Sequence, residues 1–251
     1  MVVGVRIDSN AELVVNDTKI TSHGSPTTQL KQDLVLSLGG DSTKPSIVNK
    51  VVLVDTNNTE RDYASISTTD WTLSNITNGK RATCSKTISI TASYTIAKIR
   101  LYADTLLYFE YTLSTTQPVT SGSQVSVSIT IDVTISISHT AGGTLVSASV
   151  TTWAGDEIIR RFITGERKGK KINTIQLVYG GGTVAIVTGT VTTDTTNLIV
   201  TLSVNYTPSS DVTIDEYDHS TEDLYTITQV KIQAVTLSSG VTHSWSLTIQ
   251  F

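Results

Sequence analysis

The sequence has little of several residue types, and each shortage narrows what the protein can be. It contains one cysteine, Cys84, which excludes both an intramolecular disulfide and a cysteine-rich metal site. Free cysteine usually lies inside folded proteins, so we expect Cys84 to be a buried thiol.

Long hydrophobic runs are also missing. No stretch of about 18 consecutive apolar residues occurs, so the sequence predicts no membrane span. Residues 1–8 lack the basic and the continuous apolar segments of a secretory signal, and we expect no export leader there.

Charge is sparse and nearly balanced. Charged residues make up 16% of the chain, and 18 Lys and Arg face 22 Asp and Glu, for a net charge of −4. This balance provides no overall positive field for nucleic acid, so a nucleic-acid partner is not the leading expectation. Ser and Thr replace charged residues between Val and Ile, as they do on the exposed faces of strands.

Catalytic signatures are absent from the sequence. The histidines show no zinc-motif spacing, and neither a Gly-x-Ser-x-Gly elbow nor a His-Glu-x-x-His helix occurs. Gly180-Gly181-Gly182 follows an apolar strand, but no Lys-Ser pair comes after it, so the pattern favours a hairpin over a phosphate loop. We therefore predict a protein that is not an enzyme and that holds no cofactor or metal.

Strand-like alternation is abundant. Val or Ile stands at every second position from Val125 to Ile135, and residues 86–94 alternate in the same way. A period of two places one face of a strand on a core and the other in solvent. Two stretches break the pattern: residues 29–38 fit a short helix or a strand, and residues 158–165 fit a helix.

A repeat organises the chain. Asn173 lies 124 positions after Asn49, and the same offset relates Leu53 to Leu177 and Asp70 to Asp194. Both helix candidates precede these strands. An offset near half the chain length indicates two copies of one unit.

The correspondence continues downstream with small shifts. Residues 88–95 align with 200–207, residues 98–103 align with 229–234, and Ser121-Gly122 aligns with Ser239-Gly240. The sequence thus predicts an all-β fold of two tandem duplicated β-sandwich domains of Greek-key or jelly-roll type, each with one short helix. The domains would span residues 1–138 and 139–251.

A basic cluster follows the second helix candidate. It consists of Arg160, Arg161, Arg167, Lys168, Lys170 and Lys171. These side chains could contact an acidic surface of a neighbouring subunit. They could also contact nucleic acid, but no aromatic side chains stand between them, as a groove for single strands would need. The alternative is favourable placement of cations near a helix C-terminus.

Three tyrosines and an acidic run are further candidates. Tyr102, Tyr108 and Tyr111 could form a platform for sugar rings, although tyrosines in alternating strands more often form core and cross-strand pairs. Residues 211–223 carry six acidic side chains and His219, without the spacing of a calcium loop, so we expect a solvated loop rather than a cation site. Glycosylation sequons occur at Asn16, Asn57, Asn75 and Asn205.

The halves resemble a known group of modules. A short helix ending in glycine at residues 158–165, the strand at 172–178, and Ser239-Gly240 before a closing strand at 245–249 resemble β-sandwich modules of virion proteins. These are capsid and tail-appendage proteins of tailed phages and archaeal viruses. The resemblance implies a structural role in a virus particle, with other copies and other virion proteins as partners, and no catalytic residues.

Two other functions stay open. A carbohydrate-binding or receptor-binding adhesin would act through the three tyrosines, with a host-surface glycan as partner. A cellular surface-fibre or surface-layer subunit would be extracellular and would need an export leader.

Overall fold

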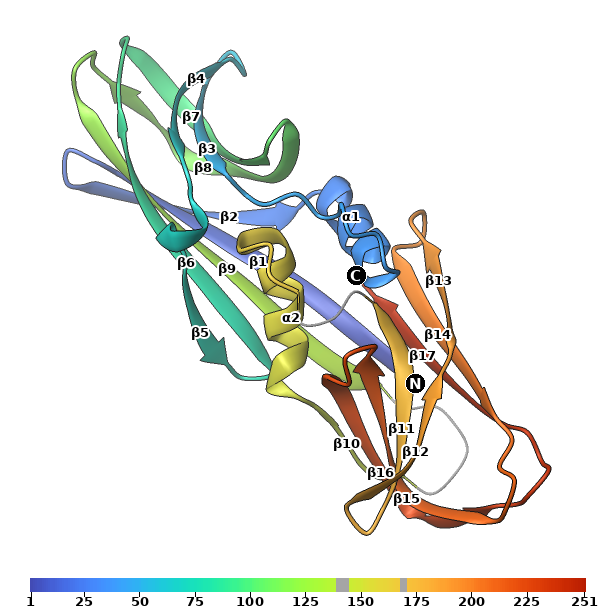
Figure 1. The fold of residues 1–251 in the computed structure, drawn as a ribbon. Helices are drawn as coiled ribbons and strands as arrows, with labels where there is room; N and C mark the ends of the chain where they lie inside the picture. Colours follow the sequence, from blue (N-terminus) through green and yellow to red (C-terminus); the bar gives the residue numbers. More distant parts are fainter. Residues whose placement is uncertain (139–144, 168–170) are drawn as a thin grey trace.

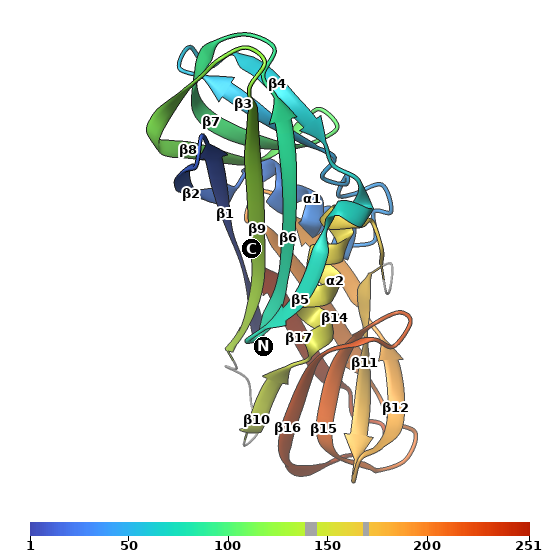
Figure 2. The same cartoon turned by 90° about the vertical axis from the view of Figure 1, so that its left-hand side faces the viewer.

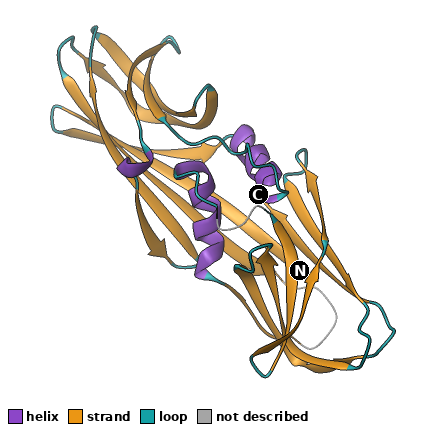
Figure 3. Cartoon of the chain, in the orientation of Figure 1, coloured by secondary structure: helices purple, strands orange, loops and turns teal. Residues whose placement is uncertain are grey.

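The computed structural model describes residues 1–138, 145–167 and 171–251. The chain is mostly β strand with two α helices, as predicted (Figure 3). The strands are β1 (Val2–Val15), β2 (Thr18–Pro26), β3 (Lys50–Asp55), β4 (Glu60–Ser65), β5 (Thr72–Ile76), β6 (Gly79–Ser89), β7 (Tyr94–Ala103), β8 (Leu106–Val119), β9 (Gln124–Ser138), β10 (Leu145–Val150), β11 (Ile172–Tyr179), β12 (Gly182–Thr188), β13 (Thr190–Asp194), β14 (Ile199–Tyr206), β15 (Val212–Thr221), β16 (Thr226–Leu237) and β17 (His243–Gln250).

Both helices form where the alternation stops. The helix α1 (Thr28–Leu38) is capped by Thr27, whose side chain accepts a hydrogen bond from the backbone of Leu30. The helix α2 (Thr152–Ile163) starts six residues earlier than predicted. A 3-10 turn also spans Thr68–Asp70. Neither α helix has the length and apolar character that a membrane crossing needs in the part of the chain described.

The strands of the two halves pair in the same order. In the first half the order β2-β8-β7-β3-β4 forms one layer, and β10-β16-β15-β11-β12 forms a five-stranded sheet in the second. The remaining strands pair as β5-β6-β9 and as β13-β14-β17. Strands β3 to β9 thus match strands β11 to β17 in both sequence order and pairing.

Strand β1 joins the two halves. It pairs antiparallel with β9 along most of its length, from Val2 with Ser138 to Val14 with Ser126. Its first residues also pair parallel with β17, at Val2 with Thr248. The result is a long central sheet in the order β5-β6-β9-β1-β17-β14-β13, with a five-stranded layer at each end of the molecule (Figures 1 and 2).

Each helix touches both halves. Helix α1 contacts β8 of its own half and β13 and β14 of the other, while α2 contacts β16 of its own half and β6 and β9 of the other. Figure 1 shows both helices in the middle of the molecule. The buried apolar residues of both halves form one connected core.

A buried ion pair lies where the helices meet this core. The guanidinium group of Arg161 on α2 donates to Glu157 at 2.5 Å and to the carbonyl oxygen of Ser37 on α1 at 2.9 Å. Nearby, Gly155 of α2 approaches the backbone of Gly79 so closely that a Cβ atom would lie 3.0 Å from the Gly79 Cα. Small residues and a neutralised charge thus let α2 pack on the opposite half.

Two predictions about the second half are wrong. The acidic run is not a loop, because residues 212–221 form β15 in the middle of the five-stranded sheet. The alignments of residues 88–95 with 200–207 and of 98–103 with 229–234 also fail. Residues 200–206 all lie in β14, whereas β6 ends at Ser89 and β7 begins at Tyr94. Strand β7 lies between β8 and β3, whereas β16 lies between β15 and β10. By pairing order, β7 matches β15 instead.

Candidate functional site

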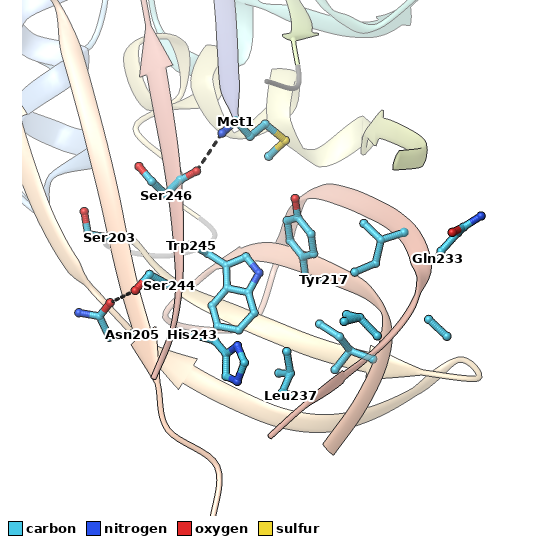
Figure 4. A pocket seen from close by; sticks show the side chains of 14 residues that line it. Met1, Ser203, Asn205, Tyr217, Gln233, Leu237, His243, Ser244, Trp245 and Ser246 are labelled. Atoms are coloured by element: carbon cyan, nitrogen blue, oxygen red, sulfur yellow. Dashed lines mark hydrogen bonds between the residues drawn. The ribbon is translucent and has the colours of Figure 1, made fainter. Parts of the chain in front are cut away.

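A cleft of about 900 Å³ opens in the second half, between the start of β17 and the strands β15 and β16. Figure 4 shows Trp245 and His243 of β17 facing Tyr217 and Leu237 across it. The lining residues are Met1, Ser203, Asn205, Ile214, Tyr217, Ile232, Gln233, Ala234, Val235, Leu237, His243, Ser244, Trp245 and Ser246. The volume lies in the range of small-molecule sites, roughly 300–1,000 Å³.

Aromatic rings dominate one part of the cleft. The His243 and Trp245 rings lie 6.4 Å apart between centroids, and both side chains are half-buried. Burial raises the pKa of Tyr217 above its ordinary value, so the phenol stays protonated at neutral pH. The Nε2 atom of His243 is buried and has no hydrogen-bond partner in the described part of the chain.

Uncharged polar side chains supply the rest of the lining. Ser203 pairs with Ser246 and Asn205 with Ser244 across β14 and β17, and the Ser244 hydroxyl donates to the Asn205 Oδ1 atom at 2.6 Å. The side chains lining the cleft include no Asp, Glu, Lys or Arg. The cleft thus offers apolar faces and neutral donors and acceptors together.

The first half carries buried valines at the matching place. The N–H group of Gly122 donates to the carbonyl oxygen of Ile90, and that of Gly240 donates to the carbonyl oxygen of Pro208. Three and five residues after Gly122 stand Val125 and Val127, which are fully buried in the core. Three and five residues after Gly240 stand His243 and Trp245, so larger and more polar side chains occupy the matching positions beside the cleft.

The described arginines of the predicted basic cluster do not form one surface patch. Arg161 is fully buried, and Arg160 pairs with Asp156 at 2.7 Å and with Glu166 at 2.5 Å. Arg167 donates to the carbonyl oxygens of Asp41 and Lys44.

The structure describes only one of the three remaining members of that cluster. Lys168 and Lys170 lie outside the described residues, and Lys171 is half-buried. The described arginines therefore serve internal contacts, and the interpretation of the cluster as a binding surface is corrected for Arg161 in particular.

The predicted tyrosine platform is also corrected. Tyr108 and Tyr111 are fully buried; the Tyr108 hydroxyl donates to Asp33 at 2.7 Å, and the Tyr111 hydroxyl lies 2.5 Å from that of Ser9. Only Tyr102 stays partly exposed, with the Lys50 ammonium 4.8 Å from its ring centre. The alternative interpretation, that tyrosines of alternating strands belong to the core, holds for Tyr108 and Tyr111.

One acidic residue of the run, its histidine and the cysteine lie in the interior. Asp218 and His219 of β15 are buried, and burial followed by the Glu216 carboxylate raises the pKa of Asp218 to about 7. Within the described residues, no group of three or more His, Cys, Asp or Glu could hold a metal ion. Cys84 is a buried free thiol, as predicted, and burial raises its pKa to about 11.

The cleft residues were not singled out from the sequence. His243 was considered only for zinc spacing, and Trp245 only as part of the closing strand. The sequence repeat could have pointed to them. Gly122 aligns with Gly240, and three and five residues later the first half has valines where the second half has His243 and Trp245.

The outer edges of the two five-stranded layers differ. Strand β12 is the last strand of its sheet, and no charged residue occurs from Tyr179 to Thr193. Val184 and Ile186 of β12 are exposed. The matching edge β4 carries three charged residues in its first three positions, Glu60, Arg61 and Asp62.

Comparisons with known proteins give no relative: no family model, no curated protein and no solved structure matches this chain.

Proposed function

We propose that the protein is a non-enzymatic structural subunit that assembles with copies of itself, and that the assembly is a virus particle of which it forms a capsid or tail-appendage part. The observation that carries the assembly is the uncharged, apolar edge strand β12. The virion setting is supported by the resemblance of both halves to β-sandwich modules of virion proteins.

An open sheet edge presents unpaired backbone N–H and C=O groups that pair readily with another strand. Natural proteins block such edges with charged residues, especially lysine, or with proline. Strand β12 has neither kind of block, and Ile186 is 52% exposed on it. Burying its apolar side chains against a second strand would gain roughly 25 cal/mol per Å².

A second copy of β12 is the partner that fits best. Antiparallel pairing centred on Ala185 would place Ile186 of each copy opposite Val184 of the other. The strand carries no charge, so the two copies would meet without electrostatic repulsion. The two five-stranded sheets would then form one continuous sheet across a two-fold axis.

The first half provides a matched control. Ile186 pairs with Gln176 on β11, and Tyr63 pairs with Val52 on β3, where Gln176 lies 124 positions after Val52. Tyr63 is 62% exposed, comparable to Ile186. Tyr63→Lys therefore adds the same charge at the equivalent place on an edge that already carries charges.

The duplication is proposed along with this function. It is supported by the common pairing order and by matching contacts: the carbonyl oxygens of Asn49 and Asn173 each accept a hydrogen bond at 2.7 Å, from Ile66 and from Gly189. The Gly122 and Gly240 contacts provide a second match. The two copies then differ most at their edges and at the cleft.

Light scattering after size-exclusion chromatography, over a range of protein concentrations, tests the assembly. The wild-type protein should show a mass that is a multiple of the chain mass, Ile186→Lys should shift it to the monomer, and Tyr63→Lys should leave it unchanged. A wild-type protein that stays monomeric at high concentration, or equal effects of both variants, would contradict the proposal.

The position within a particle needs a second measurement. Mass spectrometry of purified particles should find the protein as an abundant component. A cellular surface-fibre or surface-layer subunit is the competing setting, and it would place the same edge-to-edge assembly on a cell surface instead.

A further inference from the structure

We propose that the cleft of the second half binds a neutral saccharide. The site is independent of the β12 edge, because its lining comes from β14 to β17 and the N-terminal residue. The inference rests on three observations: the aromatic side chains in the cleft, the neutral polar groups beside them, and the buried histidine nitrogen without a partner.

Aromatic faces match the apolar faces of sugar rings. A pyranose presents C–H groups on its faces and hydroxyl groups around its edge, so it stacks on aromatic rings and forms hydrogen bonds sideways. Trp245 and His243 provide such rings from β17, and Tyr217 lies across the cleft on β15 (Figure 4). An amphipathic aromatic side chain suits a site that is apolar at one side and wet at the other.

The polar lining matches sugar hydroxyl groups. Ser203, Ser244 and Gln233 carry hydroxyl or amide groups, each of which can both donate and accept a hydrogen bond, as a sugar hydroxyl can. The buried Nε2 atom of His243 has no hydrogen-bond partner in the described part of the chain. A buried polar atom of this kind is unfavourable unless a water molecule or a ligand hydroxyl group supplies the missing hydrogen bond.

The charge of the lining selects among saccharides. The side chains lining the cleft include no Asp, Glu, Lys or Arg, and burial lowers the pKa of the Met1 amino group, which donates to the Ser246 carbonyl oxygen at 3.0 Å. A sulfated or uronic-acid glycan would find no arginine or lysine to neutralise it. A neutral oligosaccharide is the class that the cleft fits.

The same region of the first half lacks this site. Val125 and Val127 fill the positions that match His243 and Trp245, and both are buried in the core. One saccharide per chain is therefore expected. Nonspecific binding to the ends of both halves would instead give two bound saccharides per chain, so the binding stoichiometry distinguishes the two cases.

Isothermal titration calorimetry with maltotriose, cellotriose and N-acetylchitotriose, together with a glycan array, tests the proposal. At least one neutral glycan should bind with one site per chain. Trp245→Ala should weaken that binding at least about tenfold, as removal of a central aromatic anchor does. Trp245→Phe should retain most of it, because an aromatic ring remains.

Trp71→Phe is the control, since Trp71 is buried in the first half, away from the cleft. It should leave the affinity unchanged, and circular dichroism should show all variants folded. Binding of charged glycans alone, binding of an extended peptide with no saccharide bound, the same affinity in Trp245→Ala as in the wild type, or no binding to any neutral glycan would each overturn the proposal. Ile186→Lys should still bind the saccharide, so a failure of the edge assembly is distinguishable from a failure here.

Discussion

Replacing Arg161 by alanine should destabilise the protein far more than replacing its neighbour Arg160. Arg161 is fully buried, and its guanidinium group donates to Glu157 at 2.5 Å and to the hydroxyl and carbonyl oxygens of Ser37 at 2.6 and 2.9 Å. Burial lowers the pKa of Arg161, whereas the Glu157 carboxylate raises it. The pair thus stabilises the charge at a site where water does not reach.

The magnitude follows from what remains after the substitution. Arg161→Ala removes the cation from its buried pair with Glu157, and breaking a buried ion pair from one side costs about 3–5 kcal/mol. For a chain of this size, 1 kcal/mol lowers Tm by roughly 2–4 °C, so a decrease of about 6–20 °C is expected. The hydrogen bonds to Ser37 also connect α2 to α1, so the substitution removes contacts between the two halves.

The adjacent arginine is the control. Arg160 is partly exposed, and Asp156, its partner, keeps a second cation in Lys80 at 3.0 Å. Arg160→Ala should therefore cost no more than about 1 kcal/mol. The pair Arg161→Met with Glu157→Leu should recover most of the loss, because apolar side chains of similar size replace both charges.

Calorimetry of the four proteins decides the matter. Equal decreases in Tm for Arg161→Ala and Arg160→Ala would refute the reasoning, because the fully buried pair would then contribute no more than the partly exposed pair of Arg160 and Asp156. A double variant as unstable as Arg161→Ala would refute the explanation by the loss of a buried ion pair.

Two further predictions concern buried polar groups. The raised pKa of Asp218 means that the folded state holds this proton more tightly than the unfolded chain, so the free energy of unfolding should fall as pH rises from about 4 to about 7. Urea unfolding of Asp218→Asn at about pH 4.5 and pH 7.5 should show a smaller difference in the free energy of unfolding than the wild type does. An unchanged difference would contradict the assignment of the pH dependence to Asp218. Tyr108→Phe removes the hydroxyl that donates to Asp33 and accepts from the Ser46 backbone, and should cost about 1–3 kcal/mol in the same assay. Tyr63→Phe, at an exposed position, should cost almost nothing, and a similar cost for both would count against the role of the buried hydroxyl.

Local patterns predicted the elements well. The alternation from Val125 to Ile135 lies within β9, and its apolar residues face the core. Residues 29–38 were compatible with a helix or a strand. They form a helix, and the Thr27 side chain caps its N-terminus. These features depend on neighbours in sequence, which is why periodicity and capping signals detect them.

Long-range pairing was beyond such reasoning. The pairing of β1 with β17 joins residues at opposite ends of the chain, and no local pattern specifies it. The acidic run was misjudged because β15 is irregular between Ile214 and Glu216, so its acidic side chains do not alternate cleanly with apolar ones. Arg161 was assigned to the surface by its charge. Its partner Glu157 lies one helical turn away in the sequence, but only the fold shows that both side chains are buried.

Hydrogen–deuterium exchange tests the central claim, assembly through the β12 edge, most directly. Amide exchange in residues 183–187 should slow as the protein concentration rises and copies associate, while exchange in the matching edge strand β4 should not change. Association without any slowing of exchange at residues 183–187, or equal slowing in β4, would contradict the account.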